Sequence, residues 1–183
     1  MPLIKREMYL LNLYRNSELH GALLMGRIAR SVSSPEVLVG ATRHCATEAQ
    51  HAALLTELIV ALGGTLDPAA DTIQKRYSED GGVPKDLTDL LVLSEILEAR
   101  VLTSYREHLQ RTDIHPQIRE ALGRIIREEE AHSGDDGWAE RWLATLPHDR
   151  VQSAREKWAE IDRRVATELK FEIGANFFEK SAS

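Results

Sequence analysis

The stretch TEAQHAALL at residues 47–55 places Glu48 and His51 three residues apart within an otherwise apolar helical pattern. A second stretch, IIREEEAH at residues 125–132, repeats this motif with Glu129 and His132. Residues i and i+3 of an α-helix share one face, so each motif offers two ligating side chains that point the same way. Carboxylate and imidazole groups that converge inside a helix bundle are a ligand set that holds a pair of redox metals.

Three further glutamates interrupt apolar helical stripes. A single Glu-x-x-His motif arises easily by chance in a chain with 29 acidic residues and seven histidines. Four interrupted stripes are a different matter, because unpaired carboxylates in a core are disfavoured by burial and by mutual repulsion. We therefore predict a dimetal site with the ligands Glu18, Glu48, His51, Glu95, Glu98, Glu129 and His132.

The periodicity of apolar residues predicts an all-α protein with five long helices. They cover about residues 3–31, 35–62, 84–111, 116–146 and 149–170, and residues 64–83 are predicted to be an irregular connection. Gly134 and Gly137 predict a kink in the fourth helix. We expect one domain over residues 1–183, with a four-helix bundle in 1–146 and a C-terminal helix and apolar tail in 147–183.

The connection lengths predict how the helices pair. The first two helices are joined tightly, as are the third and fourth, so each pair should form an antiparallel hairpin. Glu18 and Glu48 lie equally far from the first turn, Glu98 and Glu129 lie equally far from the second, and these pairs are 30 and 31 residues apart. The connection of about 20 residues between the hairpins is long enough to run the length of a bundle.

Composition limits the classes of function. The net charge is −6, which disfavours nucleic acid and anionic membranes as partners. The lone Cys45 allows no internal disulfide and no Cys-x-x-Cys iron site, and is expected to fill core space. No signal peptide or membrane-spanning apolar run is recognised, so a cytoplasmic location is expected.

On these motifs the chain resembles the ferritin-like superfamily of di-iron carboxylate proteins over about residues 1–146, and is most similar to rubrerythrin and its relatives. The resemblance implies a ferritin-like four-helix bundle with a long crossover between its second and third helices; here a fifth helix would follow. It also implies bridging carboxylates at Glu48 and Glu129, histidine ligands at His51 and His132, terminal carboxylates at Glu18 and Glu98, and an exchangeable ligand at Glu95. The chain departs from typical rubrerythrins because it has no rubredoxin-like Cys-x-x-Cys domain.

The predicted function is that of a non-haem oxidoreductase with two iron ions, although Mn/Fe and Mn/Mn pairs also accept these ligands. It would activate O₂ or H₂O₂, as an oxygenase on a small-molecule substrate or as a peroxidase, with reducing equivalents from an external electron donor. The alternatives are an iron-binding, ferroxidase or peroxide-detoxifying protein without an organic substrate and, third, a tRNA-modifying hydroxylase. An apolar cavity would favour the oxygenase, a small channel the peroxidase and a basic rim the tRNA enzyme. A homodimer is expected from the apolar tail and from the family resemblance.

Several neighbours of the ligands have two interpretations. Tyr14 and Tyr105 share the ligand faces and could donate a hydrogen bond or an electron to the site, or could be core aromatics. His44, one turn before Glu48, is a candidate partner of that glutamate. Glu128 and His108 are expected to lie on the surface.

Overall fold

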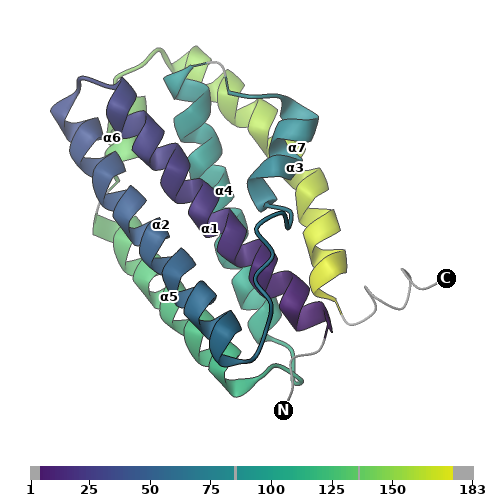
Figure 1. The fold of residues 1–183 in the computed structure, drawn as a ribbon. Helices are drawn as coiled ribbons and strands as arrows, with labels where there is room; N and C mark the ends of the chain where they lie inside the picture. The colour runs from purple at the N-terminus through teal and green to yellow at the C-terminus, as the bar shows by residue number, and fades with distance from the viewer. Residues whose placement is uncertain (1–4, 85, 136, 175–183) are drawn as a thin grey trace.

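The protein is described here from a computed structural model that covers residues 5–84, 86–135 and 137–174, and all regular secondary structure within those ranges is helical (Figure 1). The helices are α1 (Lys5–Ser31), α2 (Pro35–Ala61), α3 (Ile73–Gly81), α4 (Leu87–Leu109), α5 (Pro116–Asp135), α6 (Trp138–Leu143) and α7 (His148–Ile173). The prediction of an all-α fold is confirmed.

Local sequence signals account for most helix boundaries. Pro35 occupies the first turn of α2, where its missing N–H is not needed, and Gly63 follows the helix with a φ of +70°. Helix α4 begins after Asp86, whose side chain accepts a hydrogen bond from the backbone N–H of Asp89. The ends of the long helices therefore lie within a few residues of those predicted.

The prediction was wrong for the connection, whereas the interruption expected in the fourth helix is present. Residues 64–83 are not wholly irregular, because they contain α3, which Thr72 caps by accepting from the backbone N–H of Lys75. Ile73 and Tyr77 of this short helix are fully buried, so tertiary packing stabilises a helix in a stretch rich in glycine and proline. The predicted helix over 116–146 is divided into α5 and α6 close to the expected kink.

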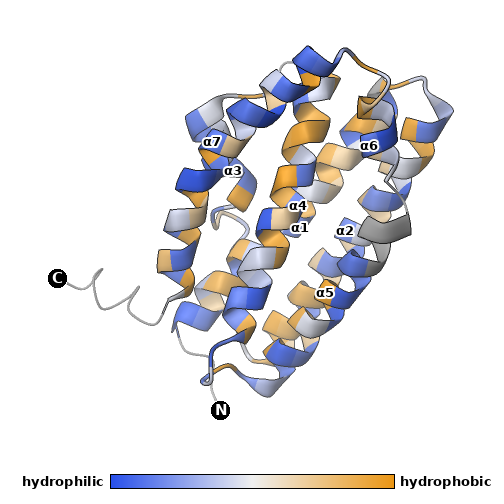
Figure 2. Ribbon diagram, turned by 180° about the vertical axis from the view of Figure 1, so that it is seen from behind, coloured by the Kyte–Doolittle hydropathy of each residue, from blue (hydrophilic) through white to orange (hydrophobic). Residues whose placement is uncertain are grey.

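The helices form a bundle around one apolar core. Helix α1 packs along α2, α4 packs along α7, and α5 lies against both α2 and α4 (Figure 1). Seen from behind, apolar residues form an almost continuous band on α4 and an inward-facing stripe on the other helices (Figure 2). The buried stripe of α7 consists of Val151, Ala154, Trp158, Ile161, Val165, Leu169 and Ile173.

Helix α6 is seated on α2 through a close contact. A Cβ atom on Gly40 would lie 2.3 Å from Cγ of Trp138, so only glycine at this position lets the indole rest on the α2 backbone. Trp138 is 7% exposed. The contact holds the segment after α5 against the helix that carries Glu48 and His51.

The crossover between the hairpins is tied to α1 by hydrogen bonds from polar side chains. Asn12 Oδ1 accepts from the backbone N–H of Asp67 at 2.8 Å, and Asn16 Nδ2 donates to the carbonyl oxygens of Asp67 and Ala70, both at 3.0 Å. At the next residue of α1, Ser17 Oγ accepts from the backbone N–H of Ile73 at 2.9 Å. The crossover is therefore anchored at several points immediately before Glu18.

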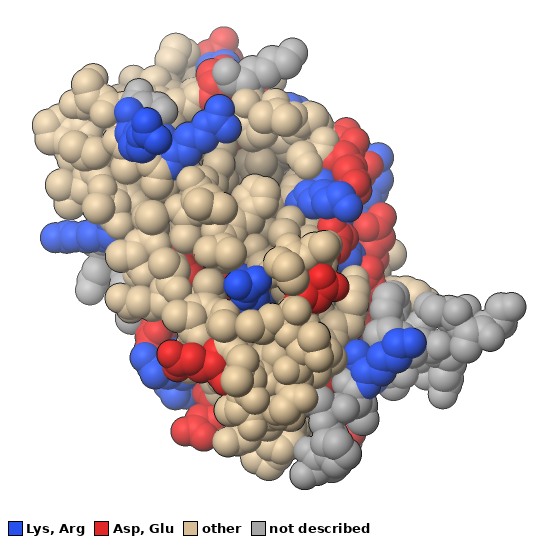
Figure 3. Space-filling model, in the orientation of Figure 1, with Lys and Arg blue, Asp and Glu red and all other residues tan. Residues whose placement is uncertain are grey.

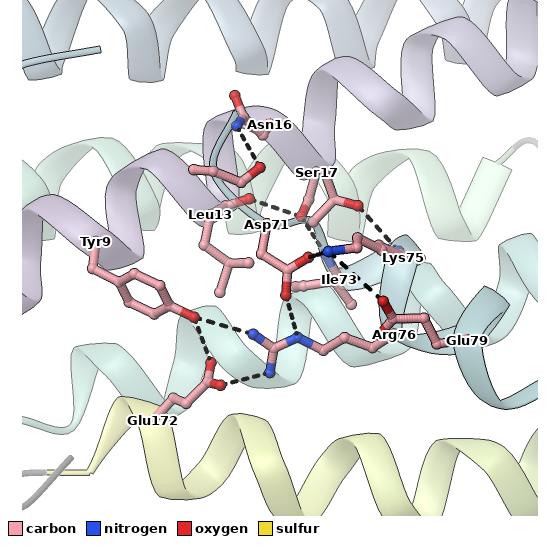
Figure 4. Close-up of polar contacts among 12 residues, drawn as sticks. Tyr9, Leu13, Asn16, Ser17, Asp71, Ile73, Lys75, Arg76, Glu79 and Glu172 are labelled. Atoms are coloured by element: carbon pink, nitrogen blue, oxygen red, sulfur yellow. Dashed lines mark hydrogen bonds and ion pairs between the residues drawn. The ribbon is translucent and has the colours of Figure 1, made fainter. Parts of the chain in front are cut away.

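The buried guanidinium of Arg76 joins the crossover to α1 and α7, the first and last helices (Figure 4). Arg76 of α3 has 8% of its side chain exposed and lies 2.9 Å from Glu172 of α7 and 3.3 Å from Asp71. It also donates to the hydroxyl of Tyr9 in α1, which in turn donates to Glu172 at 3.1 Å. These contacts fix α3 between α1 and α7.

The surface carries both signs of charge. Figure 3 shows acidic and basic side chains gathered along the edge formed by α7, and a largely uncharged centre. The apolar tail was expected to include Phe177 and Phe178, which lie outside the described residues, and the predicted dimer stays a prediction. Within the described ranges, no helix combines the length and the apolar character needed to cross a membrane.

Candidate metal centre

Five of the seven predicted ligands line one region between the helices. Glu18 comes from α1, Glu48 and His51 from α2, Glu98 from α4 and Glu129 from α5. Three of them are deeply buried, with exposed fractions of 4% for Glu18, 9% for Glu48 and 1% for His51. The two hairpins thus bring their acidic positions to a common depth, as the equal distances from the turns predicted.

The ring of His51 lies at the centre of this group. Its Nδ1 is 2.9 Å from Oε1 of Glu129 and 3.5 Å from Oε2 of Glu18, yet it makes no hydrogen bond of suitable geometry. Ligand atoms bound about 2.1 Å from one ion, at octahedral to tetrahedral angles, lie roughly 3.0–3.4 Å apart. Glu18, His51 and Glu129 could therefore hold a metal ion.

The other ring nitrogen of His51 supports the same conclusion. Nε2 lies 3.2 Å from Oε2 of Glu128, whose other oxygen accepts from Arg124 at 2.7 Å. A metal-bound histidine commonly donates its second N–H to a carboxylate, which fixes the tautomer and the orientation of the ring. The prediction that Glu128 is only solvated was wrong, because its side chain reaches across to α2.

Glu48 is accommodated by a glycine of the facing helix. A Cβ atom on Gly21 of α1 would lie 2.6 Å from Oε2 and 3.0 Å from Cδ of Glu48. Glycine is costly within a helix, by about 1 kcal/mol relative to alanine, so its place here marks a close approach. The space left by the missing side chain holds one carboxylate oxygen of the candidate site.

His44 connects two of the carboxylates. Its Nε2 is 2.9 Å from Oε1 of Glu48 and 3.5 Å from Oε1 of Glu98. A cationic ring in this position would offset part of the negative charge. His44 is thus a partner of a predicted ligand, as its place one turn before Glu48 suggested.

Burial and crowding of like charges shift the acid–base properties of the group. Burial, followed by repulsion from Glu18, raises the pKa of Glu48 well above its ordinary value. Burial and repulsion from Glu129 raise the pKa of Glu98 to about 8. These carboxyl groups resist ionisation in the metal-free protein, which is the situation that a bound cation relieves.

The pKa values of the two remaining central groups, Glu18 and His51, are shifted in the directions that favour their charged forms. Burial alone would raise the pKa of Glu18, but the neighbouring polar groups of His51 and Glu48 outweigh burial and lower the pKa. Burial lowers the pKa of His51, but the carboxylates of Glu129 and Glu18 outweigh it and raise the pKa to about 10. In the absence of metal, the imidazolium is the cation that neutralises the centre.

Glu95 stands apart from the close group. Its Oε2 lies 3.7 Å from Nη2 of Arg155 in α7, and its buried Oε1 has no hydrogen-bond partner. Burial and repulsion from Glu140 raise its pKa to about 7. The structure places Glu95 beside the candidate centre but does not bring it within the Glu18, His51 and Glu129 set.

The two tyrosines differ in their contacts. Tyr105 is fully buried and its hydroxyl donates to Oε1 of Glu18, so it touches the candidate centre. Tyr14 packs edge-on against Tyr105 with ring centroids 4.7 Å apart, and its own buried hydroxyl has no hydrogen-bond partner. Tyr105 thus positions a ligand, whereas Tyr14 contributes packing.

For two histidines, His132 and His108, the structure does not confirm the expectation from the sequence. The side chain of His132 lies outside the described residues, so its predicted role as a ligand stays a prediction. His108 was expected on the surface, but it is fully buried and its Nε2 lies 2.9 Å from Glu7. Glu7 lies near the start of α1, 101 residues from His108, and no local pattern in the sequence pairs the two.

Two cavities reach the candidate centre. The α1–α4 cavity measures about 480 Å³ with its open mouth and is lined by Glu18, Glu48, Glu98 and Glu129. The α6 cavity measures about 790 Å³ with its mouth and reaches Glu98 and Glu129 from the side of α2 and α6. The candidate centre is thus approached from two sides.

Comparisons of the chain with protein-family models, with curated proteins and with solved structures found no match. The assignment of function accordingly rests on the residues and their geometry.

Proposed function

We propose that the protein is a non-haem dimetal oxidoreductase with ferritin-like topology, in which a pair of iron ions activates O₂ or H₂O₂. The observation that carries the proposal is the convergence of Glu18, His51 and Glu129 from three helices, with ligand atoms within 4.8 Å of one another and the first two residues buried. Two hairpins joined by an anchored crossover support the ferritin-like topology.

The chain's own residues have distinct parts in this proposal. His51 would bind through Nδ1, because its Nε2 is engaged by Glu128. Glu48 and Glu98, with Glu129 shared, would complete a second position, to which the sequence adds His132. When bound, two ferrous ions would supply the electrons that reduce O₂ or H₂O₂.

Metal binding in this proposal is coupled to the release of protons. Glu48 and Glu98 have raised pKa values and hold protons on their carboxyl oxygens in the metal-free protein. They would release these protons when cations enter, because metal ligands bind in their deprotonated forms. The hydroxyl of Tyr105 would orient Glu18 by donating to Oε1.

The α6 cavity favours an oxygenase with an organic substrate as one form of this activity. It combines Trp138 and Gly40 with charged groups and is roomier than the α1–α4 cavity. A tRNA substrate is less well supported, since the described lining carries Arg43 beside four glutamates instead of a basic rim.

Metal binding is tested first, without reference to activity. The purified chain, stripped by chelation, is titrated anaerobically with Fe(II), and bound metal is counted per chain. We expect two ions per chain and a marked rise in melting temperature, because cations relieve the repulsion between buried carboxylates. A chain that retains less than one ion, with an unchanged melting curve, would refute the proposal.

Stopped-flow mixing then compares the oxidants. Fe(II)-loaded protein is mixed separately with O₂ and H₂O₂, and oxidation of the metal is followed by absorbance. Glu129→Ala should lose at least one ion per chain. The matched control is Glu130→Ala, because Glu130 is exposed and pairs with Arg106 on the surface. Full metal content in Glu129→Ala would remove the assignment of Glu129.

A further inference from the structure

Helix α2 carries a second histidine that faces the candidate centre. His44, Glu48 and His51 are spaced four and three residues apart, so they share one face of the helix. The side chain of His44 is 16% exposed, and it lines both the α1–α4 cavity and the α6 cavity. A metal ion that enters by either cavity therefore meets this imidazole.

The contacts of His44 have the same form as those of His51. Nε2 of His44 lies 2.9 Å from Oε1 of Glu48 and 3.5 Å from Oε1 of Glu98. Nδ1 of His51 likewise has one carboxylate oxygen at 2.9 Å and a second at 3.5 Å. Each imidazole thus directs one nitrogen between two carboxylates that come from different helices.

These contacts describe a metal site in which a hydrogen takes the place of the ion. One hydrogen lies between Nε2 of His44 and Oε1 of Glu48, whichever of the two atoms carries it. Ligand atoms that share one ion lie roughly 3.0–3.4 Å apart, so an ion in place of this hydrogen would change the two distances from Nε2 by about 0.5 Å or less. The side chain of Glu98 is 34% exposed, which leaves it room to turn toward the ion.

Glu48 connects the two histidine sets. Its Oε1 contacts Nε2 of His44, while its Oε2 occupies the space beside Gly21 of α1. Gly21 lies one turn after Glu18 on the same helix. One oxygen of Glu48 is thus directed to the His44 set and the other to the helix that carries Glu18, as in a carboxylate that bridges two ions.

The charge of the group agrees with one histidine for each ion. The group contains four carboxylates and two imidazoles, which belong to Glu18, Glu48, Glu98, Glu129, His44 and His51. Two divalent ions balance four carboxylates, and neutral imidazoles complete the coordination without adding charge.

We propose that His44 is a metal ligand, which binds the second ion through Nε2 together with Glu48 and Glu98. This inference rests on the proposed function and refines it, because it assigns an imidazole of the second position to a residue outside the two Glu-x-x-His motifs. The assignment is independent of His132. In the metal-free protein, the contact with Glu48 holds Nε2 where the ion will bind.

The test uses ¹¹³Cd(II) as the probe and requires no redox chemistry. Metal-free protein with ¹⁵N-labelled histidine is titrated with ¹¹³Cd(II), and the ring nitrogens are followed by NMR. We expect two ions per chain and scalar coupling between the second ion and Nε2 of His44. Such coupling requires a direct bond between the nitrogen and the metal, so a merely supporting role for His44 cannot produce it.

A variant and its control accompany the titration. His44→Gln should bind the second ion at least tenfold more weakly than the native chain and should keep the first ion at His51. His148→Gln, an exposed change at the start of α7, is the matched control and should bind both ions as the native chain does.

Each outcome decides the inference. If two ions bind and neither couples to Nε2 of His44, the residue only supports Glu48, and the inference is overturned while the proposed function stands. Equal affinity of the native and His44→Gln chains for the second ion has the same consequence. If the chain binds a single ion, the dimetal function fails, and the presence or absence of coupling to that ion decides the role of His44 by itself. A chain that binds no ion overturns both.

Discussion

Gly21→Ala is the change that tests the candidate centre most directly. The new Cβ would stand 2.6 Å from Oε2 of Glu48, about 0.8 Å closer than an ordinary contact of 3.4 Å. The carboxylate must move, because the α1 backbone is held by its packing along α2. Glu48 would then leave the position in which it faces Glu18 and His44.

Gly21→Ala should affect the stability of the fold and its affinity for metal in opposite directions. Replacement of a helical glycine by alanine stabilises a helix by about 1 kcal/mol, and the displaced carboxylate offsets some of that gain. Displacement of a metal ligand or its support weakens metal binding by about 10–100-fold. We therefore expect a metal-free variant about as stable as the native chain or slightly more so, with much poorer affinity for Zn(II) in calorimetric titration.

Gly26→Ala is the matched control on the same helix. Its Cβ would meet only Sγ of Cys45, at 3.4 Å, and nothing of the candidate centre. It should raise the melting temperature by about 2–4 °C and leave metal affinity unchanged. If Gly21→Ala binds Zn(II) as tightly as Gly26→Ala, the assignment of Glu48 to a metal site is refuted.

Three further predictions concern charge and hydrogen bonding. The free energy of unfolding of the metal-free protein should fall as the pH rises from about 5 to 8. Glu98 has a pKa of about 8 in the folded chain and about 4.3 in the unfolded chain, so over this range the folded chain holds a proton that the unfolded chain has released. Urea melts of the metal-loaded protein should show a weaker dependence on pH. Arg76→Met should destabilise the fold by about 2 kcal/mol in urea melts, because it leaves the partly buried carboxylates of Asp71 and Glu172 without their cation. The exposed Glu79→Gln should change the free energy of unfolding by less than about 0.5 kcal/mol. Tyr105→Phe should weaken Zn(II) binding about tenfold, because it removes the hydroxyl that donates to Glu18. Tyr14→Phe removes a hydroxyl without a hydrogen-bond partner, so it should change neither the Zn(II) affinity nor the stability of the fold. Equal affinities in the two variants would contradict the role given to Tyr105.

Periodicity was sufficient to predict the long helices, and the short connections predicted the pairing of α1 with α2 and of α4 with α5. The apolar stripes of α1, α2, α4 and α7 are strong, and the breaks at Pro35 and Pro116 are unambiguous. Helix α3 was missed because its nine residues contain only two buried apolar anchors, and their partners lie far away in the sequence. Short elements stabilised by tertiary contacts carry little local signal.

The candidate site was predictable in its main residues but not in its surroundings. Glu18, His51 and Glu129 interrupt apolar stripes at matched heights, which is a pattern that one sequence can reveal. Glu128 was expected on a solvated face, and only the packing of α5 against α2 brings its carboxylate to His51. Contacts between separate helices of this kind are not visible in the periodicity of either helix.

The residues of the candidate centre are synthesised at different times, Glu18 and His51 with the first hairpin and Glu129 with α5. Glu129 follows His51 by 78 residues, so at about 5–20 residues per second roughly 4–16 seconds pass between their syntheses. During that interval the nascent first hairpin displays an imidazole and two carboxylates with no counterpart from α5. Binding of the proposed ion by all three residues would therefore have to wait until α5 emerges, after the first hairpin has been made.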